Sequence, residues 1–167
     1  NRTSGSSSNT HGYTSGGYPN TAMIDKFTFA SAADATEHAD LILARGNTAG
    51  QTSLTHGYTS GGFDNTNNSD SIDKFSFSNA NTIADHGNLS LARRGGCGQS
   101  SGTRGYTSGG YTNTYVANVD YFDFSSNSTA TAHGNLSQAR SASAGTSSMT
   151  RGYVSGGTNG SHVDTID

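Results

Sequence analysis

The sequence predicts an all-β protein in which one unit of about 47 residues occurs three times and begins a fourth time. Three observations predict it: sequence markers recur in a fixed order, apolar residues alternate as in strands, and no stretch sustains the apolar spacing of a helix. Apolar residues make up only 30% of the chain, which is rich in Gly, Ser, Thr and Asn. Such small polar residues suit tight turns and solvent-facing strand positions.

Three markers define the repeat. The first is Gly-Tyr-x-Ser-Gly-Gly, which begins at Gly12, Gly57, Gly105 and Gly152. The second is Ile/Val-Asp-x-Phe, at 24–27, 72–75 and 119–122. The third is Leu-x-x-Ala-Arg, which ends at Arg45, Arg93 and Arg140. These markers divide the chain into units 1–45, 46–93 and 94–140 and a partial fourth unit, 141–167.

Each unit is predicted to hold four short strands, the first two separated by a tight turn. In the second unit these two strands are predicted at 49–54 and 56–60, and Gly61-Gly62 ends the second of them. The first strands of the other units fall at the equivalent positions, 4–9, 97–102 and 144–149. The units differ in length directly after the glycine pair, so we expect a surface loop there.

The third and fourth strands of the second unit are predicted at 72–78 and 85–92. One face of the third strand is formed by alternate residues, Asp73, Phe75 and Phe77. One face of the fourth is formed by Leu89 and Leu91. The first unit's stretch 34–43 also suits a helix, but its equivalents contain Gly, which weakens a helix by roughly 1 kcal/mol relative to Ala. We therefore predict a strand there too.

Four strands in a unit of this length are typical of one blade of a β-propeller. The marker order also resembles Kelch repeats, in which a Gly-Gly pair ends the second strand and the fourth strand closes near an Arg. A third strand of an apolar-Tyr-Asp type lies between these two features in Kelch units. In the second unit the glycine pair, the third-strand marker and the end of the fourth strand fall at 61–62, 72–75 and 89–93. The chain departs from the Kelch pattern because it has no Trp, and 57–60 replaces the bulky apolar run before the glycine pair. The resemblance implies a Kelch-like β-propeller of three complete blades and a partial fourth.

A closer resemblance is to the Gly-, Ser- and Thr-rich Kelch-like repeats of virion proteins from marine tailed phages. Segments 20–21, 24–25 and 144–148 are similar to that subtype. The resemblance implies a structural or fibre protein of a virion or extracellular assembly, whose partners are other protein subunits. We also expect the chain to be a segment of a longer protein, or its last edge to be covered in an assembly.

The repeated polar residues are predicted to be structural. The four glycine pairs are expected to supply positive φ or close backbone approach, since no helix follows to build a phosphate site. They are Gly16 and Gly17, Gly61 and Gly62, Gly109 and Gly110, and Gly156 and Gly157. Asp25, Asp73 and Asp120 are expected to accept hydrogen bonds from a turn, or to pair with Arg45, Arg93 and Arg140. Such pairs would either lock one blade to the next or tie strands within a blade.

A histidine and a tyrosine also recur at fixed positions of the unit, first as His38 and Tyr13. His38, His86 and His133 are predicted to make a repeated hydrogen bond or packing contact rather than to bind a metal, because equivalent positions on different blades lie too far apart. Tyr13, Tyr58, Tyr106 and Tyr153 are assigned to the core. Cys97 stands where other units have Ala, and is predicted to be a small buried hydrophobe.

The variable loops hold the candidate binding residues. Oxygen-bearing side chains at alternate positions, Asp64, Thr66, Asn68 and Asp70, resemble a Ca²⁺ loop, although the Gly and distal Glu of such a loop are missing and Asn and Asp are ordinary turn formers. Ca²⁺ is the one cofactor that the sequence suggests. Aromatic residues follow the glycine pairs at Tyr18, Phe63 and Tyr111, where exposed rings would stack on sugars.

The sequence therefore predicts a non-enzymatic structural or interaction module. The alternatives are a lectin-like module that binds a cell-surface glycan, and a propeller domain of a secreted carbohydrate-active enzyme. Nine Lys and Arg spread along a chain of net charge −3 give no basic footprint for nucleic acid. No apolar run is long enough to cross a membrane as a helix. No catalytic constellation is visible.

Overall fold

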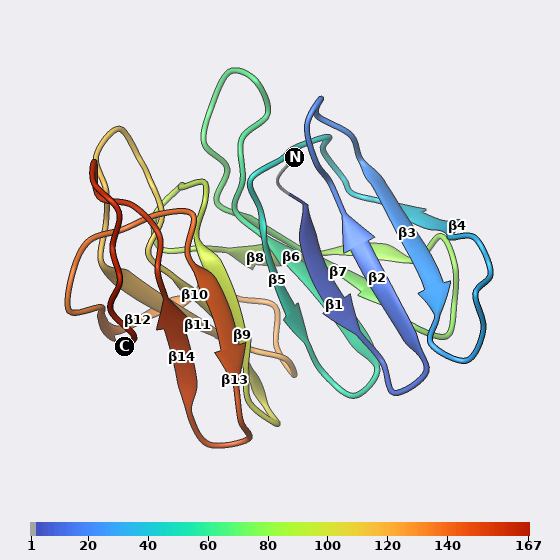
Figure 1. Cartoon of the computed structure of the whole chain (residues 1–167). Coiled ribbons are helices and arrows are strands. Elements are labelled where there is room, and N and C mark those ends of the chain that lie inside the picture. The colour runs from blue at the N-terminus through green and yellow to red at the C-terminus, as the bar shows by residue number, and fades with distance from the viewer. Residues whose placement is uncertain (1–2) are drawn as a thin grey trace.

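A computed structural model describes residues 3–167, which contain no helix. Consecutive strands form three four-stranded antiparallel sheets and then a two-stranded one (Figure 1). In each complete sheet the strands lie in chain order, so every unit of the repeat makes one sheet. The prediction of an all-β chain with four strands per unit is confirmed for the three complete units.

The strand bounds follow the repeat. Sheet 1 contains β1 (Ser4–Ser7), β2 (His11–Ser15), β3 (Met23–Thr28) and β4 (Thr36–Asp40). Sheet 2 contains β5 (Ala49–Thr52), β6 (His56–Ser60), β7 (Ser71–Ser76) and β8 (Ile83–Asn88). Sheet 3 contains β9 (Cys97–Ser100), β10 (Arg104–Ser108), β11 (Asn118–Asp123) and β12 (Thr131–Asn135). Sheet 4 contains β13 (Ala144–Ser147) and β14 (Gly152–Ser155).

The first strands end two residues earlier than predicted, because a tight turn starts sooner. After β5, the Ser53 backbone N–H donates to the His56 carbonyl, and the Ser53 hydroxyl accepts the His56 N–H at 3.1 Å. The same serine turn recurs at Ser8, Ser101 and Ser148. The strand predicted within 34–43 is confirmed as β4.

The fourth strand exists as predicted, but its predicted bounds and its leucine face are wrong. β8 covers Ile83–Asn88 rather than 85–92, and Leu89 and Leu91 lie beyond its end. Leu89 is buried, whereas Leu91 is exposed, so the two do not share a buried face. The chain leaves the sheet here because the Ser90 backbone N–H donates to Asp120 of the next sheet, at 2.9 Å. Leu89 and Leu91 alternate as strand residues do, but they lie in the segment that follows β8.

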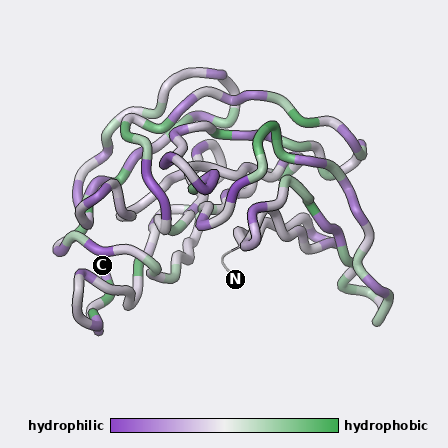
Figure 2. Tube along the Cα trace, turned by 90° about the horizontal axis from the view of Figure 1, so that it is seen from above, coloured by the Kyte–Doolittle hydropathy of each residue, from purple (hydrophilic) through white to green (hydrophobic). Residues whose placement is uncertain are grey.

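The sheets meet through their first strands, which lie side by side in the order β1, β5, β9 and β13. A methyl group on Gly50 would overlap the carbonyl oxygen of Gly5, and one on Gly98 would overlap that of Gly50. Glycine therefore lets neighbouring sheets approach closely along this line. Seen from above, the trace bends into an open arch (Figure 2).

The core is divided into small clusters between adjacent sheets. Tyr13, Ile24 and Leu41 of the first unit enclose Phe75 from the second. Tyr58, Ile72 and Leu89 enclose Phe122 in the same way. Tyr13 and Tyr58 are almost fully buried, as predicted, whereas Tyr153 is 40% exposed. Asp73 and Phe75 both face the first unit, as predicted, since Asp73 pairs with Arg45 and Phe75 packs with Tyr13. Phe77 also packs on Tyr13, but it lies one residue beyond the end of β7.

Hydroxyl groups complete the packing where apolar side chains are few. The Ser15 and Thr59 hydroxyls lie 2.8 Å apart across sheets 1 and 2, and the Ser60 and Thr107 hydroxyls lie 2.8 Å apart across sheets 2 and 3. The buried Gln51 amide donates to the Thr107 hydroxyl at 2.9 Å. Because buried polar groups cost little once they are hydrogen-bonded, this network lets a chain with 30% apolar residues bury its sheet interfaces.

Candidate functional site

The glycine pairs shape the ends of the second strands. All eight glycines have positive φ, between 63° and 141°. In the second unit the Gly62 N–H donates to the carbonyl of Arg93, at 2.9 Å, which ties the pair to the end of its own unit. The structure therefore places these glycines in the scaffold, and strands rather than helices follow the loops that they begin.

The repeated Arg and Asp residues join one sheet to the next. Arg45 pairs with Asp73 at 3.1 Å and Arg93 pairs with Asp120 at 3.2 Å, with all four side chains at most 1% exposed. Arg140 pairs with Asp167 in the same way. Of the two arrangements that the sequence allowed, the lock between units is the one observed. Asp25 lies in β3 of the first sheet, where residues 3–167 supply no Arg partner.

The buried guanidinium groups are also held by backbone carbonyls. The Arg45 Nε–H donates to Gly61 at 2.9 Å, and its Nη2 donates to Thr59 at 3.2 Å. Burial lowers the pKa of Arg93, and the carboxylate of Asp120 opposes that shift. These carboxylates are committed to ion pairs, so they are not placed as free acids or bases.

The repeated histidines bridge neighbouring sheets. The His38 Nε2–H donates to the Ser76 carbonyl at 2.7 Å, and the His86 Nε2–H donates to the Asp123 carbonyl at 2.9 Å. Both rings are buried beside a tyrosine, at centroid distances of 5.1 and 5.0 Å. The prediction of a repeated hydrogen-bonding role is confirmed for these two. His133 is exposed.

The suggested Ca²⁺ loop is arranged as a turn. One Asp64 carboxylate oxygen accepts the N–H groups of Thr66 and Asn67, at 2.8 and 2.7 Å. These backbone hydrogen bonds lower the pKa of Asp64. The Asn68 amide instead reaches the next loop, and residues 3–167 contain no cluster of three or more His, Cys, Asp or Glu side chains suited to a metal. The turn interpretation has direct support, and a Ca²⁺ site involving Asp70 stays a prediction.

The loop aromatics fall into two groups. Tyr18 is 69% exposed, as predicted. Phe63 and Tyr111 are half-buried and enclose the guanidinium of Arg94, which lies 4.5 Å from the Phe63 centroid and 5.1 Å from that of Tyr111. Sequence reasoning missed Arg94. The available signal was that Arg94 replaces Gly46 and Ser141 of the other units, and so breaks the repeat.

Hydrogen bonds join the loops into one surface. The Asn20 amide donates to the Phe63 carbonyl at 2.8 Å, and the Asn68 amide donates to the Thr112 carbonyl at 3.1 Å. Arg94 donates to the Asn68 side-chain oxygen at 3.3 Å and pairs through its backbone with Tyr111. We call Phe63, Asn68, Arg94 and Tyr111 the loop surface. It offers ring faces, amide groups and one cation in a fixed arrangement.

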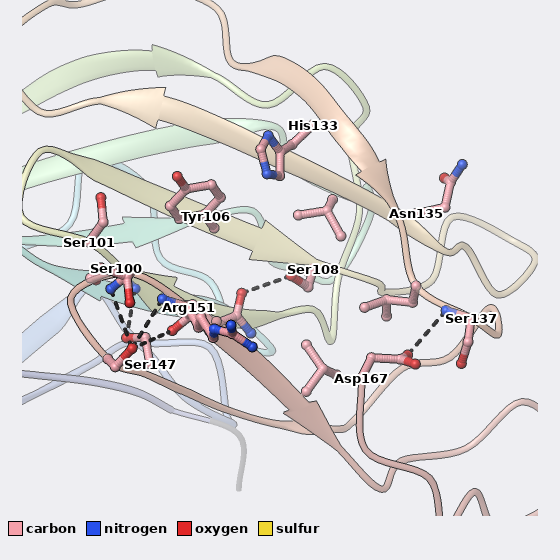
Figure 3. A pocket seen from close by; sticks show the side chains of 17 residues that line it. Ser100, Ser101, Tyr106, Ser108, His133, Asn135, Ser137, Ser147, Arg151 and Asp167 are labelled. Atoms are coloured by element: carbon pink, nitrogen blue, oxygen red, sulfur yellow. Dashed lines mark hydrogen bonds between the residues drawn. The ribbon is translucent and has the colours of Figure 1, made fainter.

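A pocket of about 320 Å³ lies between sheets 3 and 4 (Figure 3). Its apolar wall comes from Tyr106, Val119, Leu136 and Val154, and its polar rim includes Arg151. Cys97 is buried nearby in β9, where burial raises the pKa of its thiol. The predicted role of Cys97 as a small buried side chain is confirmed.

Comparison with known proteins shows the fold alone. No protein-family model matches the sequence, and no curated protein matches it. The chain is similar to the solved structure of YjhT, with a TM-score of 0.82 at 12% sequence identity. The match covers 98% of this chain and spans 59% of the YjhT chain. None of the described segments is a helix able to span a membrane.

Proposed function

We propose that the chain is a run of Kelch-like β-propeller blades that acts as a non-enzymatic interaction module through its loop surface. The propeller assignment is supported by the blade-length repeat, by the consecutive antiparallel sheets that meet along their first strands, and by the likeness to YjhT. The setting in a virion or extracellular fibre rests on the sequence resemblance alone, and the likeness to YjhT adds no support for it.

Arg94 between Phe63 and Tyr111 is the observation that carries the binding proposal. Residues that recur in every unit hold the sheets together, whereas Arg94 occurs once and lies where the loops are cross-linked. A fixed surface loses little conformational freedom when it binds a partner. Aromatic and Arg side chains are also the residue types that carry most binding energy at protein interfaces.

A glycan is the ligand class that the loop surface suits best. Aromatic ring faces stack on the apolar faces of sugar rings, while amide and guanidinium groups bond to hydroxyls. Tyr18 extends the same set of loops with a further exposed ring. A protein subunit is the second candidate, since an Arg flanked by aromatic rings also suits a protein interface.

A glycan array with the wild type and the double variant Phe63→Ala/Arg94→Ala tests the proposal. We expect binding by the wild type and a loss of at least tenfold in affinity in the double variant. Leu54→Ala is the matched control, because Leu54 is 90% exposed in the turn at the opposite end of β6. Wild-type binding that the double variant retains would refute the loop surface as the site, and no binding to any glycan would leave the protein subunit as the candidate.

A further inference from the structure

The guanidinium of Arg94 carries a charge that no carboxylate of residues 3–167 balances. Arg94 is half-buried, and its Nη1 donates to the neutral side chain of Asn68. Every other arginine in this range that is at least partly buried forms an ion pair with an Asp, namely Arg45, Arg93, Arg104 and Arg140. Because partial burial weakens the screening of a charge by water, a cation such as Arg94 attracts an anion from outside the chain.

The aromatic neighbours of Arg94 leave its N–H groups available. The ring centroids of Phe63 and Tyr111 lie 4.5 and 5.1 Å from the guanidinium carbon. A ring attracts a cation through the quadrupole of its face, but it offers no oxygen acceptor. Nε and Nη2 of Arg94 donate to none of residues 3–167, and neither is among the buried polar atoms that lack a partner, so both reach solvent. They form one edge of the planar group, and that edge can bind two oxygens of one anion.

Asn68 and the loop backbones fix the position of this edge. The Asn68 amide nitrogen donates to the Thr112 carbonyl at 3.1 Å while its oxygen accepts from Arg94, so both ends of the amide group are used within the protein. The backbones of Arg94 and Tyr111 exchange hydrogen bonds of 3.1 and 2.8 Å. The loops that contribute these residues belong to the second and third units, both of which are complete. An anion that binds here therefore meets donors that are already in place.

The backbone arrangement around Arg94 recurs, but the cation occurs at one junction between units. Gly46 and Ser141 hold the equivalent places and make the same antiparallel bridge to the next loop. The scaffold therefore does not require a charge at this position, since Gly and Ser also serve there. The cation without a counter-charge is the feature that distinguishes this junction from the other two.

The acidic residues of the same loop do not pair with Arg94. One Asp64 carboxylate oxygen accepts the N–H groups of its own turn, at 2.8 and 2.7 Å. Neither Asp64 nor Asp70 forms an ion pair within residues 3–167. Both still make the local potential more negative, so they weaken the attraction of an anion without cancelling a direct contact with Arg94. The chain as a whole has a net charge of −3, so it does not attract anions unspecifically.

We propose that the loop surface binds an acidic glycan, in which a carboxylate or sulfate group accepts hydrogen bonds from Nε and Nη2 of Arg94. The sugar rings beside that group contact Phe63 and Tyr111, since aromatic rings pack on the apolar faces of sugars. The inference rests on the glycan binding proposed above and adds the charge of the ligand. Carboxylate and sulfate both offer the oxygens that the guanidinium edge binds, and binding experiments separate them.

Two pairs of polymers, each pair differing in charge, test the proposal with the whole chain. Polygalacturonate is compared with its neutral methyl ester, and dextran sulfate with dextran, by isothermal titration calorimetry. We expect the wild type to bind the acidic member of at least one pair about tenfold more tightly, because charge-assisted hydrogen bonds to Arg94 are gained. This preference is expected to shrink as salt is added, since ions screen the contact. The pair that shows the preference identifies carboxylate or sulfate as the group bound.

Three variants locate the effect, with the folding of each checked by circular dichroism. Arg94→Gln removes the charge and is expected to bring the affinities for the acidic and neutral polymers to within about twofold of each other. Asp64→Asn keeps an oxygen that accepts the N–H groups of the turn, and is expected to raise the affinity for the acidic polymer about twofold because a nearby negative charge is lost. Asp34→Asn is the matched control, since it removes the same charge from the exposed loop between β3 and β4 and is expected to bind as the wild type does.

The possible results separate this inference from the glycan function on which it rests. Equal binding of acidic and neutral polymers by the wild type, or no binding to either acidic polymer, would overturn the inference, and neutral glycans that still bind would leave the glycan function standing. A preference for acidic polymers that Arg94→Gln retains would place the anion elsewhere and overturn the role of Arg94. Binding to no glycan of any kind would refute both proposals.

Discussion

The interface between sheets 1 and 2 and the interface between sheets 2 and 3 share one design, but they differ in how the buried carboxylate is satisfied. Asp120 accepts the backbone N–H and the hydroxyl of Ser90 in addition to Arg93. At the equivalent position Asp73 meets Ile42, which offers only its backbone N–H. One oxygen of Asp73 is buried without a hydrogen-bond partner among the described residues.

The difference shows that the repeated ion pair is not sufficient by itself. A buried pair stabilises a fold only when the remaining polar atoms also find partners, because taking the charges out of water is costly. Ser90 satisfies both oxygens of Asp120, whereas one oxygen of Asp73 is left unpaired in the first interface. The Nε–H of Arg93 is also buried without a partner among the described residues, but it belongs to a delocalised cation whose other nitrogens donate to Asp120 and Thr107. We therefore expect the first interface to be the weaker of the two.

The largest expected effect comes from removing one Arg. Arg45→Met and Arg93→Met each leave a buried carboxylate unpaired, which costs about 3–5 kcal/mol. Arg45→Met is expected to cost more, because Asp73 keeps one hydrogen bond whereas Asp120 keeps those from Ser90. Urea unfolding followed by circular dichroism and tyrosine fluorescence measures both variants.

The double variant Arg93→Met/Asp120→Leu is the control for this comparison. Replacing both charges by apolar groups is expected to recover most of the lost stability, since no buried charge remains. A cost below about 1 kcal/mol for both single variants would contradict a role for the buried pairs in holding the sheets together. A larger cost for Arg93→Met than for Arg45→Met would contradict the ranking of the interfaces.

Exchanging Ile42 and Ser90 between the two interfaces is expected to give smaller effects, which shift the stability in opposite directions. Ile42→Ser is expected to stabilise the chain by about 1 kcal/mol, because a hydroxyl there can donate to Asp73. Ile42 is 58% exposed, so its removal leaves no cavity. Ser90→Ile is expected to destabilise the chain by about 2 kcal/mol by leaving an Asp120 oxygen unpaired. Thermal unfolding measures the melting temperature of both variants. Shifts of equal size in the same direction would refute the role assigned to the serine hydroxyl.

The smallest expected effect is a pH dependence that arises from His56 in sheet 2. Burial, and then the charges of Lys74 and His86, lower the pKa of His56 from its ordinary 6.5. The unfolded chain therefore binds the proton first, and stability falls as the pH drops from 6.5 through the lowered pKa. His56→Gln is expected to remove this part of the acid sensitivity. The measurement is the change in melting temperature between pH 8 and pH 5, taken for the wild type and for the variant. An equal change in both proteins would contradict the role of His56.

Much of the scaffold could be predicted from the sequence, because residues with the same structural role recur at the same positions in three units. The positive φ of Gly61 and Gly62, the hydrogen-bonding role of His38 and His86, and the burial of Tyr13 all follow from residues that recur in phase. Recurrence also suggested that Asp and Arg pair, and it left two arrangements for such pairs, between units or within one. Only the structure could decide between those two, since the partners lie in different units.

The remainder depended on contacts between units that sequence spacing does not encode. The contact of Ser90 with Asp120 spans 30 positions, and it draws the chain out of the strand that alternating leucines had predicted. The place of Arg94 between Phe63 and Tyr111 depends likewise on how two loops meet. Arg94 differs from its equivalents Gly46 and Ser141, which was a signal, whereas Ser90 recurs as Ser137 and gave none. In neither case could the partners be read from the repeat.

The shared interface also has an evolutionary consequence. Sheet 2 receives Arg45 through Asp73 on one side and extends Arg93 to Asp120 on the other. Each unit thus carries one complementary half of the contact at each of its borders. Unequal recombination that duplicates or deletes one unit in frame rejoins matching halves, so a gene of this type can change its number of sheets while every new junction remains paired.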